Sequence, residues 1–284
     1  MKNTIKIKKY SGALVDFDLD KLIQSLRNSQ ANEELVQSIA KEVQNKLFDG
    51  ISTKQIYQMA YKILKRKTTP SASRYKLKKA IMELGPSGFP FEKFISKIVS
   101  HEGFKTEVGV IVQGHCVTHE VDVVAINDPK HYMIECKYHN TQGRVNNVRI
   151  PLYIQSRFKD IEKQCKKDKK GKFNFYQGWI YTNTRFTSDA IDYANCVNLK
   201  LVSWDYPTGS SLKDKINKYR LFPITTLTVL TKSDKTKLLE KGVVLCKEVC
   251  ENPQILTDAG IDKKKHKKIL ENAKELSETV LGIH

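Results

Sequence analysis

Two short apolar segments of the chain carry acidic and basic side chains at every second position. The first contains Glu120 and Asp122, and the second contains Glu135 and Lys137. Because successive side chains of a β-strand point to opposite faces, each pair shares one face while its apolar neighbours take the other. Isolated charges inside an apolar sheet are costly, so we expect these side chains to pair with one another or to bind a cation.

The chemistry that these residue types favour is metal-assisted hydrolysis of a phosphodiester. Asp122 and Glu135 offer the hard oxygen ligands that Mg²⁺ prefers, with Mn²⁺ as an alternative ion. The metal would lower the pKa of a bound water, and Lys137 would orient that water and stabilise phosphate charge. A strand pair with an exposed polar face and a surface salt bridge explains the same pattern equally well from the residues alone.

The segments around these residues predict a mixed α/β domain. Turn-forming residues at 85–88 and 127–129 interrupt the apolar pattern. We expect, in chain order, a helix at 91–100, strands at 104–112, 116–126 and 131–138, a helix at about 148–165, a strand at 175–182, a helix at 189–196 and a strand at 200–204. This order suits a central mixed sheet with helices on both faces.

The spacing of these residues also resembles a known signature. Asp122, a spacer of 12 residues and Glu135-Cys136-Lys137 resemble the PD-(D/E)xK nuclease motif, in particular its Mrr-like restriction endonuclease branch. Glu92, on the apolar helix opened by Gly88, and the Phe186-Thr187 segment also match that branch. The resemblance implies a restriction-endonuclease-like fold and a DNA substrate. It also implies catalytic roles for Glu92, Asp122, Glu135 and Lys137, with the three carboxylates as metal ligands.

The first 84 residues predict a β-hairpin followed by a small helical bundle. Apolar alternation on either side of Ser11-Gly12 indicates the hairpin. Asp18 is a candidate N-cap for the first helix, and Ser52 with Gln55 forms a capping-box pattern for a later one. A further helix is expected over residues 71–84.

This N-terminal region resembles an ATP cone domain, the nucleotide-sensing module of ribonucleotide reductases. The matching segments are residues 7–12 and 17–22, although Tyr10-Ser11 stands where the family has Arg-Asp. The resemblance implies ATP or dATP as a regulatory ligand, with phosphate contacts from Lys9 and Lys21 and with Thr53 near the base or the phosphates. The alternative is that the region serves in dimerisation or DNA contact.

The C-terminal region, residues 223–284, is expected to be small and all-helical. Its segment from Ile255 to Ile261, followed by Lys263-Lys264-Lys265, resembles a helix-hairpin-helix element. In such an element a glycine turn presents backbone N–H groups to a phosphate while lysines add charge. A helical module for oligomerisation, or one that covers the site, is the alternative.

The composition indicates which partners suit the chain. Its 284 residues carry a net charge of +18, which favours a polyanion such as DNA. No apolar run approaches the roughly 20 residues that span a bilayer, and the N-terminus has no apolar signal segment, so we expect no membrane partner. The six cysteines form no Cys-x-x-Cys pair. This pattern favours a reduced, cytoplasmic protein.

We therefore expect a multi-domain protein. Its parts are an ATP-cone-like domain at 1–84, a PD-(D/E)xK nuclease-like domain at 88–206 and a helical domain at 223–284. The predicted function is a Mg²⁺-dependent DNA endonuclease, regulated by ATP or dATP, that acts in restriction, defence or DNA processing. A homodimer or higher homo-oligomer is expected because one site handles one strand at a time. The alternatives are a catalytically inactive, nucleotide-responsive DNA-binding protein and a nucleotide-responsive adaptor.

Overall fold

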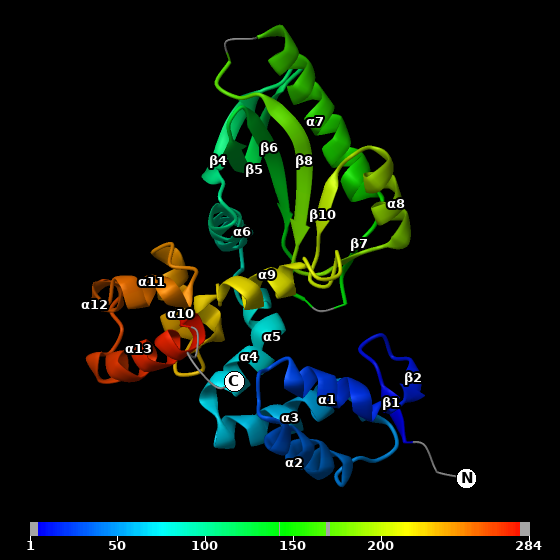
Figure 1. The fold of residues 1–284 in the computed structure, drawn as a ribbon, viewed down its shortest axis with the longest axis vertical. Coiled ribbons are helices and arrows are strands. Elements are labelled where there is room, and N and C mark those ends of the chain that lie inside the picture. Colours follow the sequence, from blue (N-terminus) through cyan, green and yellow to red (C-terminus); the bar gives the residue numbers. More distant parts are fainter. Residues whose placement is uncertain (1–4, 142, 169–170, 279–284) are drawn as a thin grey trace.

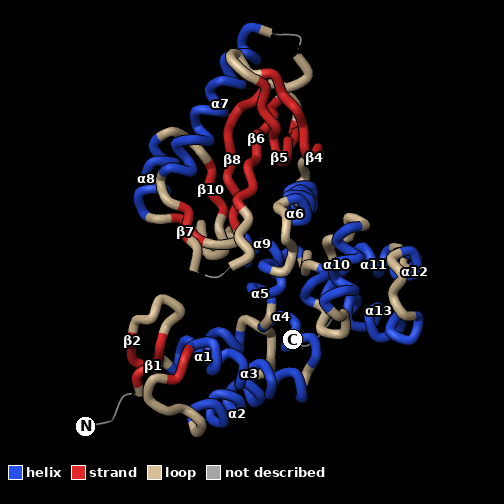
Figure 2. The backbone as a smooth tube through the Cα atoms, turned by 180° about the vertical axis from the view of Figure 1, so that it is seen from behind, coloured by secondary structure: helices blue, strands red, loops and turns tan. Residues whose placement is uncertain are grey.

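The computed structural model describes residues 5–141, 143–168 and 171–278. It confirms the expected fold class: an N-terminal hairpin with a helical bundle, a central α/β unit with a mixed sheet, and an all-helical C-terminal region (Figure 1). Figure 2 shows that the strands gather in the central unit and in the N-terminal hairpin. Within the described residues, no helix is both long and apolar enough to cross a membrane.

The N-terminal unit is built as the sequence predicts. Strands β1 (Lys6–Lys8) and β2 (Leu14–Asp16) form the antiparallel hairpin, and β3 (Ile51–Ser52) adds to β1 in parallel. Its main helices are α1 (Leu19–Arg27), α2 (Glu33–Gln44) and α3 (Thr53–Lys67).

The expected caps of this unit are present. The Asp18 side chain accepts a hydrogen bond from the Lys21 N–H at 3.1 Å, which begins α1. Ser52 and Gln55 form a capping box at the start of α3. Both contacts satisfy backbone donors that the first helical turn leaves free, so they fix where the helices begin.

The single helix expected over residues 71–84 is wrong. The structure has two short helices there, α4 (Thr69–Tyr75) and α5 (Leu77–Met82), which meet at Lys76. Ala72 of α4 packs into the core of the N-terminal unit, whereas Leu77 and Ile81 of α5 pack into the core of the central unit. The chain changes direction at Lys76 because these two cores lie on different sides of it.

The central sheet has the strand order β10-β8-β6-β5-β4. Its strands are β4 (Lys105–Gln113), β5 (Thr118–Asn127), β6 (Lys130–Lys137), β8 (Phe175–Thr182) and β10 (Lys200–Val202). The pairs β4–β5 and β5–β6 are antiparallel, and the pairs β6–β8 and β8–β10 are parallel. Strands β7 (Val145–Asn146) and β9 (Arg185–Phe186) form a separate parallel pair.

Helices cover both faces of this sheet. Helices α7 (Arg149–Lys167) and α8 (Ser188–Cys196) share one apolar cluster with Val124, Met133 and Ile180. Helix α6 (Phe89–His101) shares the other cluster with Val123 and Ile134. The alternation of side chains from Val123 to Ala125 and from Met133 to Ile134 therefore divides these apolar residues between two cores.

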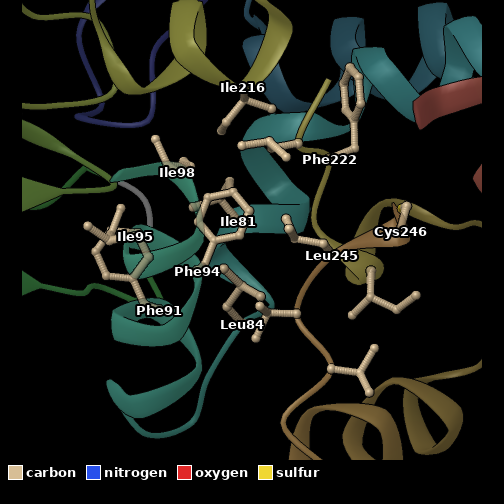
Figure 3. Close-up of a cluster of buried hydrophobic side chains, with 14 of the residues drawn as sticks. Ile81, Leu84, Phe91, Phe94, Ile95, Ile98, Ile216, Phe222, Leu245 and Cys246 are labelled. Carbon is tan, nitrogen blue, oxygen red and sulfur yellow. The ribbon is translucent and has the colours of Figure 1, made fainter. Parts of the chain in front are cut away.

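The C-terminal region packs against α6 without a break in the core. Helix α9 (Leu212–Tyr219) precedes this region, whose elements are η1 (Ile224–Thr226), α10 (Lys232–Glu240), α11 (Cys246–Glu251), α12 (Gln254–Asp258) and α13 (Lys263–Ser277). Figure 3 shows the α6 side chains gathered with Ile81, Ile216 and Leu245, which are all buried in one cluster. The segment at 207–222 therefore contributes to the core and does more than connect two units.

Candidate active site

The candidate site forms where strand β5 separates from β6. The ladder between them runs from Asn127–Lys130 only as far as Val123–Ile134. Strand β5 continues beyond that point paired with β4 alone, as far as the pair Gln113–Thr118. Strand β6 meanwhile stays paired with β8 from His131 to Lys137. Glu120 and Asp122 consequently lie on a hairpin that leaves the sheet, while Glu135 and Lys137 lie on the strand that remains.

Asp122 takes the place of a missing strand partner. Its Oδ2 accepts a hydrogen bond from the backbone N–H of Cys136 at 2.6 Å. This contact fixes the carboxylate against the strand that carries Glu135 and Lys137. Burial, together with the negative charge of Glu135, raises the pKa of Asp122 to about 6.

Glu135 is buried and lies between two cations. Lys137 Nζ is 2.5 Å from Glu135 Oε1, and Arg157 Nη1 is 2.5 Å from Glu135 Oε2. The Glu135 residue is only 5% exposed, so its charge needs such partners. Arg157 also donates to the backbone carbonyl of Glu120, which links helix α7 to the departing hairpin.

Sequence reasoning missed Arg157. Its position gives one weak signal, because it lies three residues after Ile154 and four before Ile161 on the buried stripe of α7. An arginine at the edge of such a stripe is normally a solvated residue whose stem packs on apolar surface. Only the folded arrangement shows that its head reaches Glu135.

Helix α7 holds the departing hairpin at a second place. Asp160 accepts a hydrogen bond from the Cys116 N–H at 2.9 Å and lies 2.8 Å from the Nε2 of His119. The hydrogen bond with His119 holds the pKa of Asp160 well below its ordinary range. The tip of the β4–β5 hairpin is thereby attached to α7 after it has left β6.

Glu92 reaches the same site from the first turn of α6. Burial, together with the negative charges of Asp122, Glu120 and Glu135, raises the pKa of Glu92 to about 7, although the positive charge of Lys137 opposes the shift. The structure therefore brings Glu92, Asp122, Glu135 and Lys137 into one electrostatic group. Glu120 is exposed; its backbone carbonyl accepts a hydrogen bond from Arg157, and its charge acts on Glu92.

The three residues expected to contact a nucleotide lie on the surface of the N-terminal unit. The parallel pair of β1 and β3 ends at Lys8 and Ser52; Lys9 follows the first of these residues, and Thr53, the first residue of α3, follows the second. Lys21 lies in the first turn of α1, and its Nζ is 2.8 Å from Asp18 Oδ2. Lys9 and Thr53 thus both follow the last pair of this ladder, while Lys21 is engaged by a carboxylate.

Comparison with known proteins places this arrangement in a family. An archaeal protein from Archaeoglobus fulgidus, described only as uncharacterized, is 36% identical over 183 residues, which are 64% of this chain and 99% of that protein. The solved structure described as a protein of unknown function, AF1548, covers 67% of this chain and 98% of its own, with 34% identity and a TM-score of 0.56. The chain belongs to the AF1548-like family.

Three family descriptions match successive parts of this AF1548-like protein. Residues 5–84 match the ATP cone domain, residues 85–207 match the restriction endonuclease domain of the Mrr type, and residues 222–277 match the AF1548-like C-terminal region. Both resemblances inferred from the sequence, the ATP cone and the Mrr-like nuclease, are therefore confirmed. The candidate site lies within the restriction endonuclease domain.

Proposed function

We propose that this AF1548-like protein is a divalent-cation-dependent DNA endonuclease whose activity responds to ATP or dATP. The observation that carries the proposal is the grouping of Glu92, Asp122, Glu135 and Lys137 where β5 separates from β6. These side chains come from α6 and from two strands, and they meet within a domain that matches restriction endonucleases.

The donor set suits Mg²⁺. Asp122 and Glu135 are the proposed ligands, and Glu92 is a third carboxylate that would act directly or through water. Within the described residues, no three His, Cys, Asp or Glu side chains are grouped as a ready-made metal site. Mg²⁺ usually keeps several waters and takes only one or two carboxylates, so it suits this arrangement. When bound, the ion would activate water and offset the charge of the phosphate.

The residues of the chain itself position the reactants. Lys137, whose Nζ pairs with Glu135, would orient the attacking water and stabilise phosphate charge. The Cys136 N–H fixes Asp122, and Arg157 fixes Glu135, so neither carboxylate has to be ordered when DNA binds. Water adds to phosphorus, one P–O ester bond breaks, and the leaving oxygen takes up a proton.

The proposed DNA contacts are basic surfaces outside the site. Lys163, Lys166 and Lys167 are exposed at the end of α7, and Lys263 and Lys264 are exposed at the start of α13. Lys169 and Lys170, which belong to the same lysine run, lie outside the described residues. Gly260, with a φ of +64°, turns the chain between α12 and α13, where a helix-hairpin-helix element would bind a phosphate. A homodimer would supply one site for each DNA strand.

The proposed nucleotide site is the edge that carries Lys9 and Thr53. The N-terminus of α3, a helix of 15 residues, begins at Thr53 and favours negative charge. Lys9 and Lys21 would add positive charge for a triphosphate. The match of residues 5–84 to the ATP cone domain supports this assignment.

Nicking of supercoiled plasmid tests the proposal. The wild type should nick the plasmid with Mg²⁺ or Mn²⁺, and Asp122→Ala should not. Asp192→Ala, which changes an exposed carboxylate on α8, is the matched control and should cut normally. A wild type that binds DNA with a steep salt dependence but cuts nothing with either ion would support the inactive DNA-binding alternative.

A further inference from the structure

Tyr138, the residue that follows Lys137, connects the catalytic strand to the end of the ATP cone domain. Its hydroxyl donates a hydrogen bond to the backbone carbonyl of Met82, the last residue of α5, at 2.6 Å. A Cβ atom added to Gly85 would lie 2.5 Å from Tyr138 Cε1 and 2.9 Å from its hydroxyl. The linker between the two domains therefore closes directly on this ring, and Figure 1 shows α4 and α5 leading from the cone to the sheet.

The same ring contacts the helix that carries Glu92. The Tyr138 and Phe91 ring centroids lie 5.6 Å apart at an angle of 37°, and Phe91 immediately precedes Glu92. The Tyr138 side chain thus contacts Phe91, the residue before Glu92, and Tyr138 itself directly follows Lys137. A shift of α5, which follows the cone directly through α4, would act on both residues through Tyr138.

The backbone on both sides of Tyr138 is attached to the end of β8. Thr182 Oγ1 donates to the Lys137 carbonyl at 2.7 Å. The His139 N–H donates to Asn183 Oδ1 at 2.9 Å, and Asn183 Nδ2 donates to the His139 carbonyl at 2.7 Å. This segment is held firmly within the nuclease domain, so its link to the cone is the Tyr138 side chain.

The cone also comes close to Gly143, in the loop that follows Tyr138. Gly143 has a φ of +83°, and a Cβ there would lie 2.9 Å from Cδ1 of Tyr10. Tyr10 is the residue after Lys9, in the turn of the β1–β2 hairpin. Gln142, beside Gly143, lies outside the described residues. The edge proposed for the nucleotide phosphates therefore adjoins the chain that leaves the catalytic strand.

We propose that Tyr138 is a positioning residue through which the nucleotide state of the ATP cone acts on Lys137 and Glu92, with Tyr10 as a second contact. This inference rests on the proposed function and adds a route for its regulation. Nucleotide bound near Lys9 shifts the cone, and α4 passes that shift to α5, which is packed in the core of the central unit. The Tyr138–Met82 hydrogen bond is formed in only one of the two resulting positions of α5. A neutral hydrogen bond contributes about a fivefold factor to such an equilibrium.

The test uses the full chain and Tyr138→Phe, which removes the hydroxyl and keeps the ring on Gly85 and Phe91. The measured quantity is the ratio of plasmid nicking rates with and without saturating ATP or dATP, alongside the nucleotide affinity by calorimetry. We expect the ratio to move toward one by about fivefold and, because the coupling is reciprocal, the nucleotide affinity to change by no more than the same factor. Tyr176→Phe, at the other end of β8 and half-exposed, should keep the wild-type ratio.

A purely structural Tyr138 gives a different result. Both rates and the melting temperature would then fall in Tyr138→Phe while the ratio stayed at the wild-type value, and this would overturn the proposal. An absence of any effect of ATP and dATP on the wild type would overturn it as well. If Tyr138→Phe does not fold, Tyr10→Ser decides, because Tyr10 is 72% exposed and its loss should also lower the ratio.

Amide hydrogen exchange separates this proposal from the endonuclease assignment. Nucleotide should change the exchange of residues 137–141 in the wild type and not in Tyr138→Phe. A wild type that shows this difference but cuts no DNA would refute the endonuclease assignment and support the coupling. A wild type that cuts DNA but shows no effect of nucleotide on either the amide exchange or the nicking rate would support the endonuclease assignment and refute the coupling.

Discussion

The carboxylate of Asp122 accepts a hydrogen bond from the backbone N–H of Cys136 at 2.6 Å, at the point where their two strands part. A side chain here replaces the backbone carbonyl that a continuous ladder would supply. The contact therefore satisfies a buried donor and sets the position of a proposed metal ligand at the same time.

Asp122→Asn separates these two roles. The amide oxygen can still accept the hydrogen bond from Cys136, but the charge is gone. We expect the melting temperature without metal to change little, while plasmid nicking falls on the order of 10²-fold or more. Asp122→Leu, which removes the acceptor too, should lower both. Nicking by Asp122→Asn at the wild-type rate would remove this residue from the metal site.

The Arg157–Glu135 pair should show strong coupling in a double-mutant cycle. Arg157→Met leaves a buried carboxylate with one cation fewer, and losing one partner of such a pair costs about 3 kcal/mol or more of folding free energy. Glu135→Met with Arg157→Met should recover much of that loss. Urea unfolding of the four proteins gives the coupling, and additive losses would show that the two charges do not depend on each other.

Acid should weaken the contact between α5 and α10. Burial raises the pKa of Glu83, but its hydrogen bond with Lys235 and the charges of Lys235 and Lys76 outweigh burial, so the pKa lies below its ordinary value. A carboxyl with a lowered folded-state pKa stabilises the fold above its unfolded-state pKa, and this contribution is lost as the pH falls through the folded-state pKa.

The measurement for this contact is urea unfolding across pH. Wild type should be more stable than Glu83→Gln by about 1 kcal/mol at pH 6, and the difference should shrink below pH 4. Glu34→Gln, an exposed change on α2, is the control and should show no such dependence on pH. A difference that persists unchanged at low pH would show that packing, and not charge, underlies it.

The nuclease domain and the C-terminal region should unfold together. Phe222 is 1% exposed in the cluster that joins them, so Phe222→Ala should cost about 3–5 kcal/mol. Phe48, which is 56% exposed in the cone, is the control, and its change to Ala should cost no more than about 0.5 kcal/mol. Calorimetry should show one transition for both regions, and a separate transition for the C-terminal helices would contradict the shared core.

The lysines at the start of α13 should contribute to the salt dependence of DNA binding. Replacing exposed Lys263 and Lys264 by Gln should reduce the slope of log K against log salt by about 1 per lysine that contacts a phosphate. The control is Lys62→Gln with Lys65→Gln, two exposed changes in α3 that remove the same charge and should reduce the slope less. Equal reductions from both pairs would indicate a general charge effect and no specific contact by α13.

The sequence predicted the strands because local pattern determines them. Strand β8 has the expected bounds and helix α8 begins one residue before the expected start, since apolar periodicity and turn residues define them. The two faces of β5 and β6 follow from a period of two. The spacing from Asp122 to Lys137 therefore identified candidates that the fold brings together.

Other features depend on contacts between distant segments. Arg157 reaches Glu135 across 22 positions of sequence, and its role exists only because β5 leaves β6. The amphipathic pattern of α6 shows that one face is buried but not that the C-terminal helices cover part of it. The break at Lys76 has the same origin, because it depends on which core receives each short helix.

The continuous core between α6 and the C-terminal helices has a consequence for where DNA would be cut. Glu92 lies on α6, and the lysines at the start of α13 belong to the unit that packs against it. A duplex held by those lysines would therefore sit at a constant distance and orientation from the scissile phosphate. Such a protein would cut at a fixed distance from the phosphates that the lysines contact, whatever the base sequence between those phosphates and the cleavage position.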